Sequence, residues 1–201
     1  MWSRRSLLCL ATTMLATIPT AGFGAAGVEV REGMLGDPDA PVTIIEYFSL
    51  TCRHCADFHK ETLPVLKKRY IETGKVKLIL RDFPLDRAAL FAAVIAHCAG
   101  PERYPAFVEV FLETQEQWTR ARDPVATLKQ IAQLGGLSPA QADLCLADEA
   151  MIDAVLTMRL EGEQIYGIQS TPSFVIGGRL YAGHNTAERF AELIEPLLPK
   201  P

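Results

Sequence analysis

A pair of cysteines between an apolar strand and a helix constrains the fold of this 201-residue chain more than any other feature. The segment Cys52-Arg53-His54-Cys55 follows a β-branched and aromatic run over residues 42–48, which predicts a strand buried on both faces. After Cys52 the apolar residues recur at helical spacing until Gly74, and Pro64 predicts a kink in this helix. Residues 76–80 predict a second strand, and the segment between the two strands suits a right-handed crossover.

The position of Cys52 favours a reactive thiolate. Its side chain would lie at the N-terminus of the helix, where unpaired backbone N–H groups and the helix dipole stabilise an anion. Cys55 would lie within the first turn, close enough to form a disulfide with Cys52. Arg53 and His54 add positive charge between the thiols, which acts in the same direction. The pattern predicts a redox pair with Cys52 as nucleophile and Cys55 as resolving thiol.

Two other interpretations of this cysteine pair stay open at this point. A zinc site could combine the two thiols with His59, and with His184 as a fourth ligand, although metal knuckles do not usually open a helix after a buried strand. A purely structural disulfide is the second alternative. We favour redox activity over both, and we expect neither a metal nor any other cofactor besides the Cys52–Cys55 disulfide.

Composition excludes several classes of protein. With 49% hydrophobic and 22% charged residues, the chain is too apolar to be disordered. A net charge of -4 offers no basic surface for nucleic acid, so we expect none to bind. The length suits one domain with an insertion, whose core needs no framework of disulfides.

Residues 1–26 have the pattern of an export signal. Arg4 and Arg5 form a positive N-terminal region, an apolar stretch follows, and small residues suit cleavage after Ala26. A membrane anchor is the alternative, and the paired arginines also resemble a twin-arginine signal, although we favour the general secretory route. Cleavage would remove Cys9 and two of the 20 basic residues but none of the 24 acidic ones, so the net charge would change from -4 to -6. We therefore expect a periplasmic protein with four remaining cysteines.

The second half of the chain changes character twice. From Arg87 to residue 165 the pattern is helical, and Asp123-Pro124 and Ser138-Pro139 each combine an N-cap residue with a proline at the first helical position. Strand-like residues then return at 173–176, where Gly177-Gly178 predicts a hairpin. The final segment, which Thr186 caps, predicts a helix through Leu197. The order β-α-β, helical block, β-β-α predicts an α/β fold with an all-helical insertion.

Three segments together resemble the DsbA-like periplasmic thiol:disulfide oxidoreductases of the thioredoxin superfamily. They are residues 40–49, the Cys52–Cys55 segment and residues 171–178. The second matches the family's Cys-Pro-His-Cys except at Arg53, and the resemblance spans nearly all of residues 30–198. It implies a thioredoxin fold in two parts, residues 27–86 and 166–201, which are separated by a helical insertion at 87–165.

The resemblance also implies roles for individual residues. His54 corresponds to the histidine that stabilises the thiolate of Cys52. Pro172 corresponds to a cis-proline that packs over the disulfide, and Thr171 would offer its backbone to an extended substrate chain. Glu46 corresponds to a buried acid that assists proton transfer to and from Cys55.

Two cysteines remain in the helical block, Cys98 at the end of an apolar helix and Cys145 in the helix that Ser138 opens. Buried free thiols pack well as small hydrophobic groups. An oxidising compartment favours a structural disulfide between them instead, and some bacterial DsbA-like proteins carry a second pair. We favour the disulfide.

The resemblance implies a disulfide oxidase of exported proteins. Its substrates would be unfolded exported proteins with free cysteines, and a DsbB-like membrane quinone reductase would reoxidise it. We expect a monomer. An isomerase or reductase is one alternative, because threonine before the cis-proline is common in such enzymes. A non-catalytic, chaperone-like binder of unfolded exported chains is the other.

Overall fold

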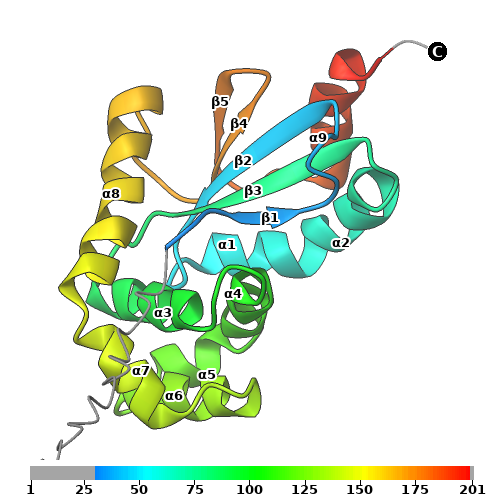
Figure 1. The fold of residues 1–201 in the computed structure, drawn as a ribbon. Coiled ribbons are helices and arrows are strands. Elements are labelled where there is room, and N and C mark those ends of the chain that lie inside the picture. Colours follow the sequence, from blue (N-terminus) through cyan, green and yellow to red (C-terminus); the bar gives the residue numbers. More distant parts are fainter. Residues whose placement is uncertain (1–29, 200–201) are drawn as a thin grey trace, which may run out of the picture.

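A mixed β-sheet forms the centre of the molecule in a computed structural model that describes residues 30–199 (Figure 1). The export signal predicted at residues 1–26 lies outside the described residues. The sheet has five strands in the order β1-β3-β2-β4-β5. The pair β2–β3 is parallel, whereas β1–β3, β2–β4 and β4–β5 are antiparallel. The strands are β1 (Gly33–Leu35), β2 (Val42–Phe48), β3 (Val76–Asp82), β4 (Ser173–Ile176) and β5 (Arg179–Ala182).

The crossover from β2 to β3 is one helical segment in four parts. They are α1 (Arg53–Asp57), the π-helical η1 (Phe58–Thr62), α2 (Leu63–Leu66) and the π-helical η2 (Lys67–Ile71). Pro64 has no N–H to donate to a preceding carbonyl, and the π-helical turn lies directly before it. Phe58 fixes the segment to the sheet, because its ring lies 4.7 Å from that of Phe174 in β4.

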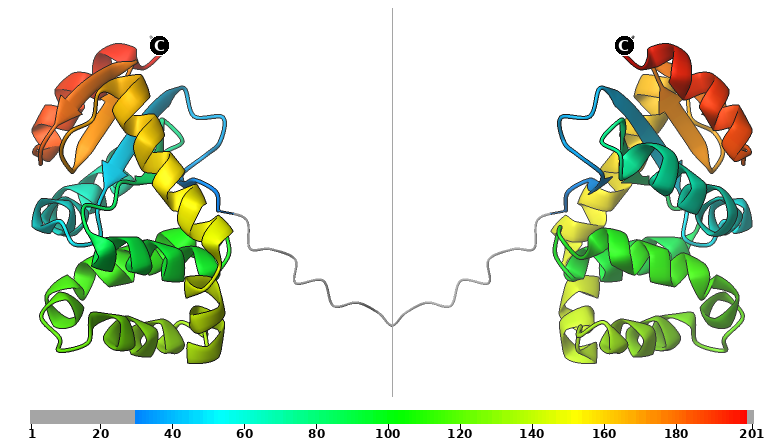
Figure 2. Two further views of the ribbon diagram at one scale, coloured as in Figure 1. Left: turned by 90° about the vertical axis from the view of Figure 1, so that its left-hand side faces the viewer. Right: turned by 90° about the vertical axis from the view of Figure 1, so that its right-hand side faces the viewer.

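Between β3 and β4 every regular element of the described chain is a helix, as the sequence predicts. The helices are α3 (Arg87–Cys98), α4 (Tyr104–Glu113), α5 (Gln115–Thr119), α6 (Pro124–Leu134), α7 (Pro139–Leu146) and α8 (Glu149–Tyr166). Figure 2 shows α3–α7 as a block stacked at one end of the sheet. The predicted caps are confirmed: the Asp123 carboxylate accepts from the backbone of Ala126, and Ser138 forms a capping box with Gln141.

Helix α8 joins the helical block to the sheet. It begins beside α7 and continues along the sheet (Figures 1 and 2). Its Gly162 lies so close to the Tyr47 ring that an added Cβ would be 2.6 Å from Cε1. Tyr166, the last residue of α8, also packs on Tyr47, with ring centroids 6.1 Å apart. The predicted boundary between residues 165 and 166 therefore lies at the end of a helix that packs on both parts of the molecule.

The C-terminal part contains the hairpin and the helix that the sequence predicts. Strand β1, in contrast, was not predicted from the sequence. Thr186 caps α9 (Ala187–Ile194), and a 3-10 turn, η3 (Glu195–Leu197), follows. Strand β1 pairs with β3, where Gly33 lies opposite Leu80. A Cβ at Gly33 would be 2.7 Å from the Tyr104 ring, so glycine permits this close approach. The sequence did not predict β1, because its three residues are too few to show the periodic pattern of a strand.

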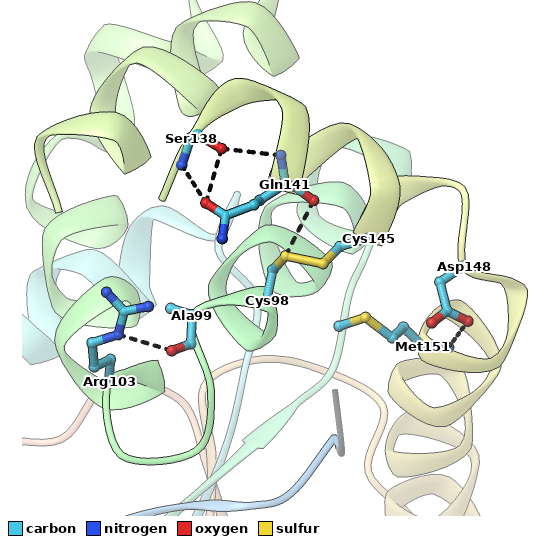
Figure 3. The surroundings of a disulfide bond; sticks show 8 residues. All are labelled: Cys98, Ala99, Arg103, Ser138, Gln141, Cys145, Asp148 and Met151. Atoms are coloured by element: carbon cyan, nitrogen blue, oxygen red, sulfur yellow. Dashed lines mark hydrogen bonds between the residues drawn. A yellow bond between two sulfur atoms is a disulfide. The ribbon is translucent and has the colours of Figure 1, made fainter. Parts of the chain in front are cut away.

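A disulfide closes the helical block. Cys98 at the end of α3 and Cys145 in α7 are joined, with their Cα atoms 6.0 Å apart (Figure 3). The Ser138–Gln141 capping box lies at the start of the same helix α7 (Figure 3). The remaining described cysteines, Cys52 and Cys55, are free. No helix of the described residues is long and apolar enough to cross a membrane.

Replacing both cysteines of this disulfide, Cys98→Ala with Cys145→Ala, should lower the free energy of unfolding by about 4 kcal/mol. That is the loop-closure value for a sequence separation of 47 residues. Urea denaturation of the oxidised proteins measures the loss. The control pair Cys52→Ala with Cys55→Ala should cost less, because its loop is much shorter. An equal or smaller loss in the Cys98/Cys145 variant would contradict the stabilising role.

Candidate active site

The two free thiols lie where β2 ends and α1 begins. Cys52 is the N-cap of α1, and its backbone carbonyl accepts hydrogen bonds from the N–H groups of Cys55 and Ala56, at 3.1 and 3.2 Å. A hydrogen bond from its own N–H to the Ser49 carbonyl fixes the turn after the strand. Cys52 is half-buried, whereas Cys55 is completely buried. An incoming thiol can therefore reach the first cysteine but not the second.

The two sulfurs differ strongly in acidity. The pKa of Cys52 is lowered to about 6, mainly because the Cys55 thiol donates a hydrogen bond to it. Hydrogen bonds from the backbone N–H groups of Cys55 and His54 act in the same direction, and together with the Cys55 thiol they outweigh the partial burial of Cys52. Burial raises the pKa of Cys55 well above its ordinary value, and the neighbouring Cys52 and Glu46 add to this. The site therefore favours one thiolate, on Cys52, beside a neutral Cys55.

The loop before β4 lies against the nucleophile. The Thr171–Pro172 peptide bond is cis, and the Cys52 thiol donates to the Thr171 carbonyl over 3.3 Å. The Thr171 hydroxyl is buried and has no hydrogen-bond partner among the described residues. The structure thus brings the two segments that the sequence singled out, residues 52–55 and 171–172, into direct contact.

The side chains of Arg53 and His54, which the sequence assigned to positive charge between the thiols, lie at the protein surface. Both are largely exposed, and both face acidic groups. The Arg53 guanidinium contacts Glu116 at 3.1 Å and Asp57 at 3.9 Å, and His54 lies 3.7 Å from Asp57. The hydrogen bonds that lower the pKa of Cys52 come from the Cys55 thiol and from the backbone N–H groups of Cys55 and His54, so the Arg53 guanidinium is not their source.

Gln115 is a site residue that sequence reasoning missed. It is buried at the start of α5, and its Nε2 donates to the carbonyls of Leu50 at 2.7 Å and Cys52 at 3.0 Å. The helical insertion thereby holds the backbone of the active-site turn. No local pattern marks this residue, because its partners lie more than 60 positions earlier in the chain.

Glu46 lies inside the protein, close enough to Cys55 to raise the pKa of that thiol. It belongs to β2 and is completely buried. His59 of η1 faces it, with Nε2 at 3.2 and 3.1 Å from the two carboxylate oxygens. The sequence singled out Glu46 as a buried acid, whereas it named His59 only as a possible zinc ligand. The spacing offered a signal, since His59 lies one helical turn after Cys55 on the inner side of the crossover helix.

The histidines of the zinc alternative have other partners. His59 pairs with Glu46, and His184 Nε2 lies 3.1 Å from the Thr62 hydroxyl. Within residues 30–199 there is no group of three or more His, Cys, Asp or Glu residues arranged to hold a metal ion.

The Cys55 thiol is the largest source of the acidity of Cys52, and this can be tested. Cys55→Ala should move the pKa of Cys52 up from about 6 toward its ordinary 9.0. In the native reduced protein the lowered pKa also predicts a stability that rises with pH between 6 and 9.0, and that is lost as the pH falls through 6. Thiolate absorbance against pH gives the midpoint, and denaturation at several pH values gives the stability.

The matched substitution is Arg53→Ala, which removes a charge but none of the hydrogen bonds to Cys52. It should leave the thiolate midpoint close to that of the native protein. A large upward shift in this variant, together with no shift in Cys55→Ala, would assign the acidity to the guanidinium instead.

Comparison with known proteins gives concordant matches. The family model described as "Thioredoxin" matches residues 29–196. The chain is 30% identical over 152 residues to a "Putative protein-disulfide oxidoreductase" of Rickettsia bellii, which covers 75% of this chain and 59% of the relative. It spans little more than half the length of the Rickettsia relatives it matches. The thiol:disulfide interchange protein DsbL of Lelliottia amnigena is 25% identical over 182 residues, covering 81% of this chain and 82% of that protein.

A solved structure agrees over most of the chain. The crystal structure of Wolbachia pipientis alpha-DsbA1 superposes with a TM-score of 0.77 at 32% identity, covering 83% of this chain and 90% of that one. BdbD of Bacillus subtilis, at 22% identity and a TM-score of 0.74, supports the fold alone.

Proposed function

Because this chain belongs to the thioredoxin family and, within it, to the DsbA-like proteins, we propose that it is a thiol:disulfide oxidase of exported proteins. One observation carries the proposal: a half-exposed Cys52 with a pKa of about 6 lies beside a buried Cys55 whose pKa is raised. Because of this asymmetry, the sulfur that a substrate thiolate attacks is assigned to Cys52, and the sulfur that leaves is assigned to Cys55. The roles that the sequence predicts, Cys52 as nucleophile and Cys55 as resolving thiol, are part of this proposal.

The reaction transfers two electrons from substrate to enzyme. A substrate thiolate attacks Sγ of Cys52, the Cys52–Cys55 bond breaks, and Cys55 leaves with the electron pair and takes up a proton. A second substrate thiolate then attacks the substrate sulfur of the mixed disulfide, and Cys52 leaves as a thiolate. The substrate gains a disulfide, and the enzyme is left as a dithiol.

The stabilised Cys52 thiolate supports oxidation over isomerisation. Stabilising the thiolate stabilises the reduced enzyme, which makes the Cys52–Cys55 disulfide a stronger oxidant. A low pKa also makes Cys52 a good leaving group in the second step. The Thr171 carbonyl accepts a hydrogen bond from Cys52. Thr171 and Pro172, which the cis bond joins, are assigned to binding of the extended substrate chain beside Cys52.

The cellular setting is proposed from the family and from the N-terminal sequence. The protein acts in the periplasm as a monomer on unfolded exported proteins with free cysteines. A DsbB-like membrane quinone reductase restores its disulfide, and no cofactor takes part. DsbL of Lelliottia amnigena carries the name of a thiol:disulfide interchange protein, which supports this class of reaction.

The redox potential separates an oxidase from a reductase. The Cys52–Cys55 pair can be equilibrated with glutathione, alkylated and analysed by mass spectrometry. The resulting redox potential should be closer to that of DsbA, about -120 mV, than to that of thioredoxin, about -270 mV. The reason is the stabilised thiolate of the reduced form. A potential near that of thioredoxin would overturn the oxidase assignment.

Cys52→Ala separates an enzyme from a chaperone-like binder. An oxidase loses oxidation of a reduced, unfolded substrate completely, because the attacked sulfur is gone. A non-catalytic binder keeps suppressing aggregation of the same substrate. Cys98→Ala with Cys145→Ala is the control, since those sulfurs lie in the helical block and should leave oxidation in place.

A further inference from the structure

The helical block contains an apolar cavity of about 460 Å³, which lies between α4, the α4–α5 turn and the end of α6. This volume is within the range of small-molecule sites in proteins. Neither Cys52 nor Cys55 borders the cavity, so the proposed reaction gives it no task. The walls include apolar side chains of α4 and α6, namely Phe107, Val110, Phe111, Ile131 and Leu134.

Apolar side chains at the rim of the cavity are open to solvent. Val110 is 41% exposed, and Leu134, the last residue of α6, is 91% exposed. Ala106 is exposed too, and it lies one turn before Val110 on the same face of α4. Singly exposed apolar residues are common, but a group of them around a cavity is typical of a binding site. A ligand with an apolar body would remove these side chains from water.

One charged side chain, that of Arg103, borders the cavity. Two backbone carbonyls fix its guanidinium: Nε donates to Ala99 over 2.9 Å (Figure 3), and Nη1 donates to Gly135 over 3.2 Å. The guanidinium also lies over the Phe107 ring, with Cζ 5.9 Å from the centroid. These partners are neutral, so they hold the cation in place without balancing its charge.

The acidic side chains of the surrounding helices that form ion pairs do so with other cations. Among the ion pairs within residues 30–199, none includes Arg103. A guanidinium carries further N–H donors that the two carbonyls do not use, and a carboxylate is their preferred acceptor. The neighbouring pairs are Glu109 with Lys67, Glu116 with Arg53, and Asp143 with Lys129.

Helix α4 sets the distance between the two ends of the cavity. Arg103 is its N-cap and Thr114 its C-cap, and the helix between them rises about 16 Å, the length of an extended alkyl chain of about twelve carbons. The polar side chains at the far end are Thr114 and Gln117, and the Thr114 hydroxyl already donates to the Val110 carbonyl over 2.7 Å. The cavity therefore combines one fixed cation with apolar walls.

We propose that this cavity binds an amphiphile of the fatty acid class, with its carboxylate on Arg103 and its unbranched alkyl chain along the apolar face of α4. The carboxylate balances the charge of the guanidinium, and the chain covers Val110 and Leu134. An alkyl chain needs no hydrogen-bond partner. Each buried peptide group of a protein segment would need one, and the apolar walls offer none, which favours the fatty acid over a bound peptide.

Isothermal titration calorimetry of the protein with dodecanoate, below the concentration at which it forms micelles, tests the proposal. We expect saturable binding at one site. Removing each methylene should weaken binding about fourfold, so decanoate should bind about fifteenfold more weakly than dodecanoate. Decanol keeps the chain but lacks the charge, and it should bind about tenfold more weakly than decanoate.

Arg103→Gln keeps an amide donor for the backbone carbonyls but removes the charge. It should weaken decanoate binding about tenfold and leave decanol binding unchanged. Ala106→Trp fills the cavity with an indole ring and should abolish binding of both compounds. Arg122→Gln is the matched control, because Arg122 is an exposed arginine of the same helical block that does not border the cavity. It should bind both compounds as the native protein does.

An equal loss in Arg103→Gln and Arg122→Gln, or full binding in Ala106→Trp, would place the ligand elsewhere and overturn the proposal. So would the absence of dodecanoate binding to the native protein, or tighter binding of a short apolar peptide than of dodecanoate. A thermal melt shows whether each variant folds. Should Ala106→Trp not fold, Val110→Asp decides, because it places a carboxylate at the exposed rim beside the alkyl chain and should abolish dodecanoate binding. Continued binding in that variant refutes the site.

Discussion

The whole site depends on the junction at which the buried strand β2 ends and the crossover helix begins at Cys52. A buried strand fixes the backbone of this point within the core, and the helix start supplies N–H groups that no preceding turn uses. The first thiol is therefore held at a helix N-terminus and remains half-exposed, while the second is carried into the core one turn later. The contrast between a lowered and a raised pKa follows from that geometry.

The helical insertion is part of the site rather than an attachment beside it. Gln115 reaches from α5 to the carbonyls of Leu50 and Cys52, and so ties the active-site turn to the helical block. Helix α8 returns to the sheet through the contact between Gly162 and Tyr47. The Cys98–Cys145 disulfide joins α3 to α7 within the block. Displacing the block would therefore also disturb the backbone that presents the nucleophile.

Charge is arranged in two layers around the thiols. At the surface, Arg53 is paired with Glu116 and Asp57, so its charge is partly balanced where solvent also screens it. Inside, Glu46 and His59 face each other among apolar side chains, where electrostatic interactions are stronger. The acidity of Cys52 arises between these layers, mainly from the hydrogen bond that the Cys55 thiol donates.

The sequence by itself predicted the local structure, because a strand, a helix cap or a hairpin depends on residues that are close together in the chain. Residues 42–48, the cysteine pair and the Thr171-Pro172 segment could be placed in this way, and so could the order of the elements. Only the tertiary structure decided that Gln115 holds the active-site turn, that His59 faces Glu46, and that β1 completes the sheet. Side-chain contacts across distant segments leave no periodic pattern, and a three-residue strand is stabilised by its neighbours rather than by its own residues.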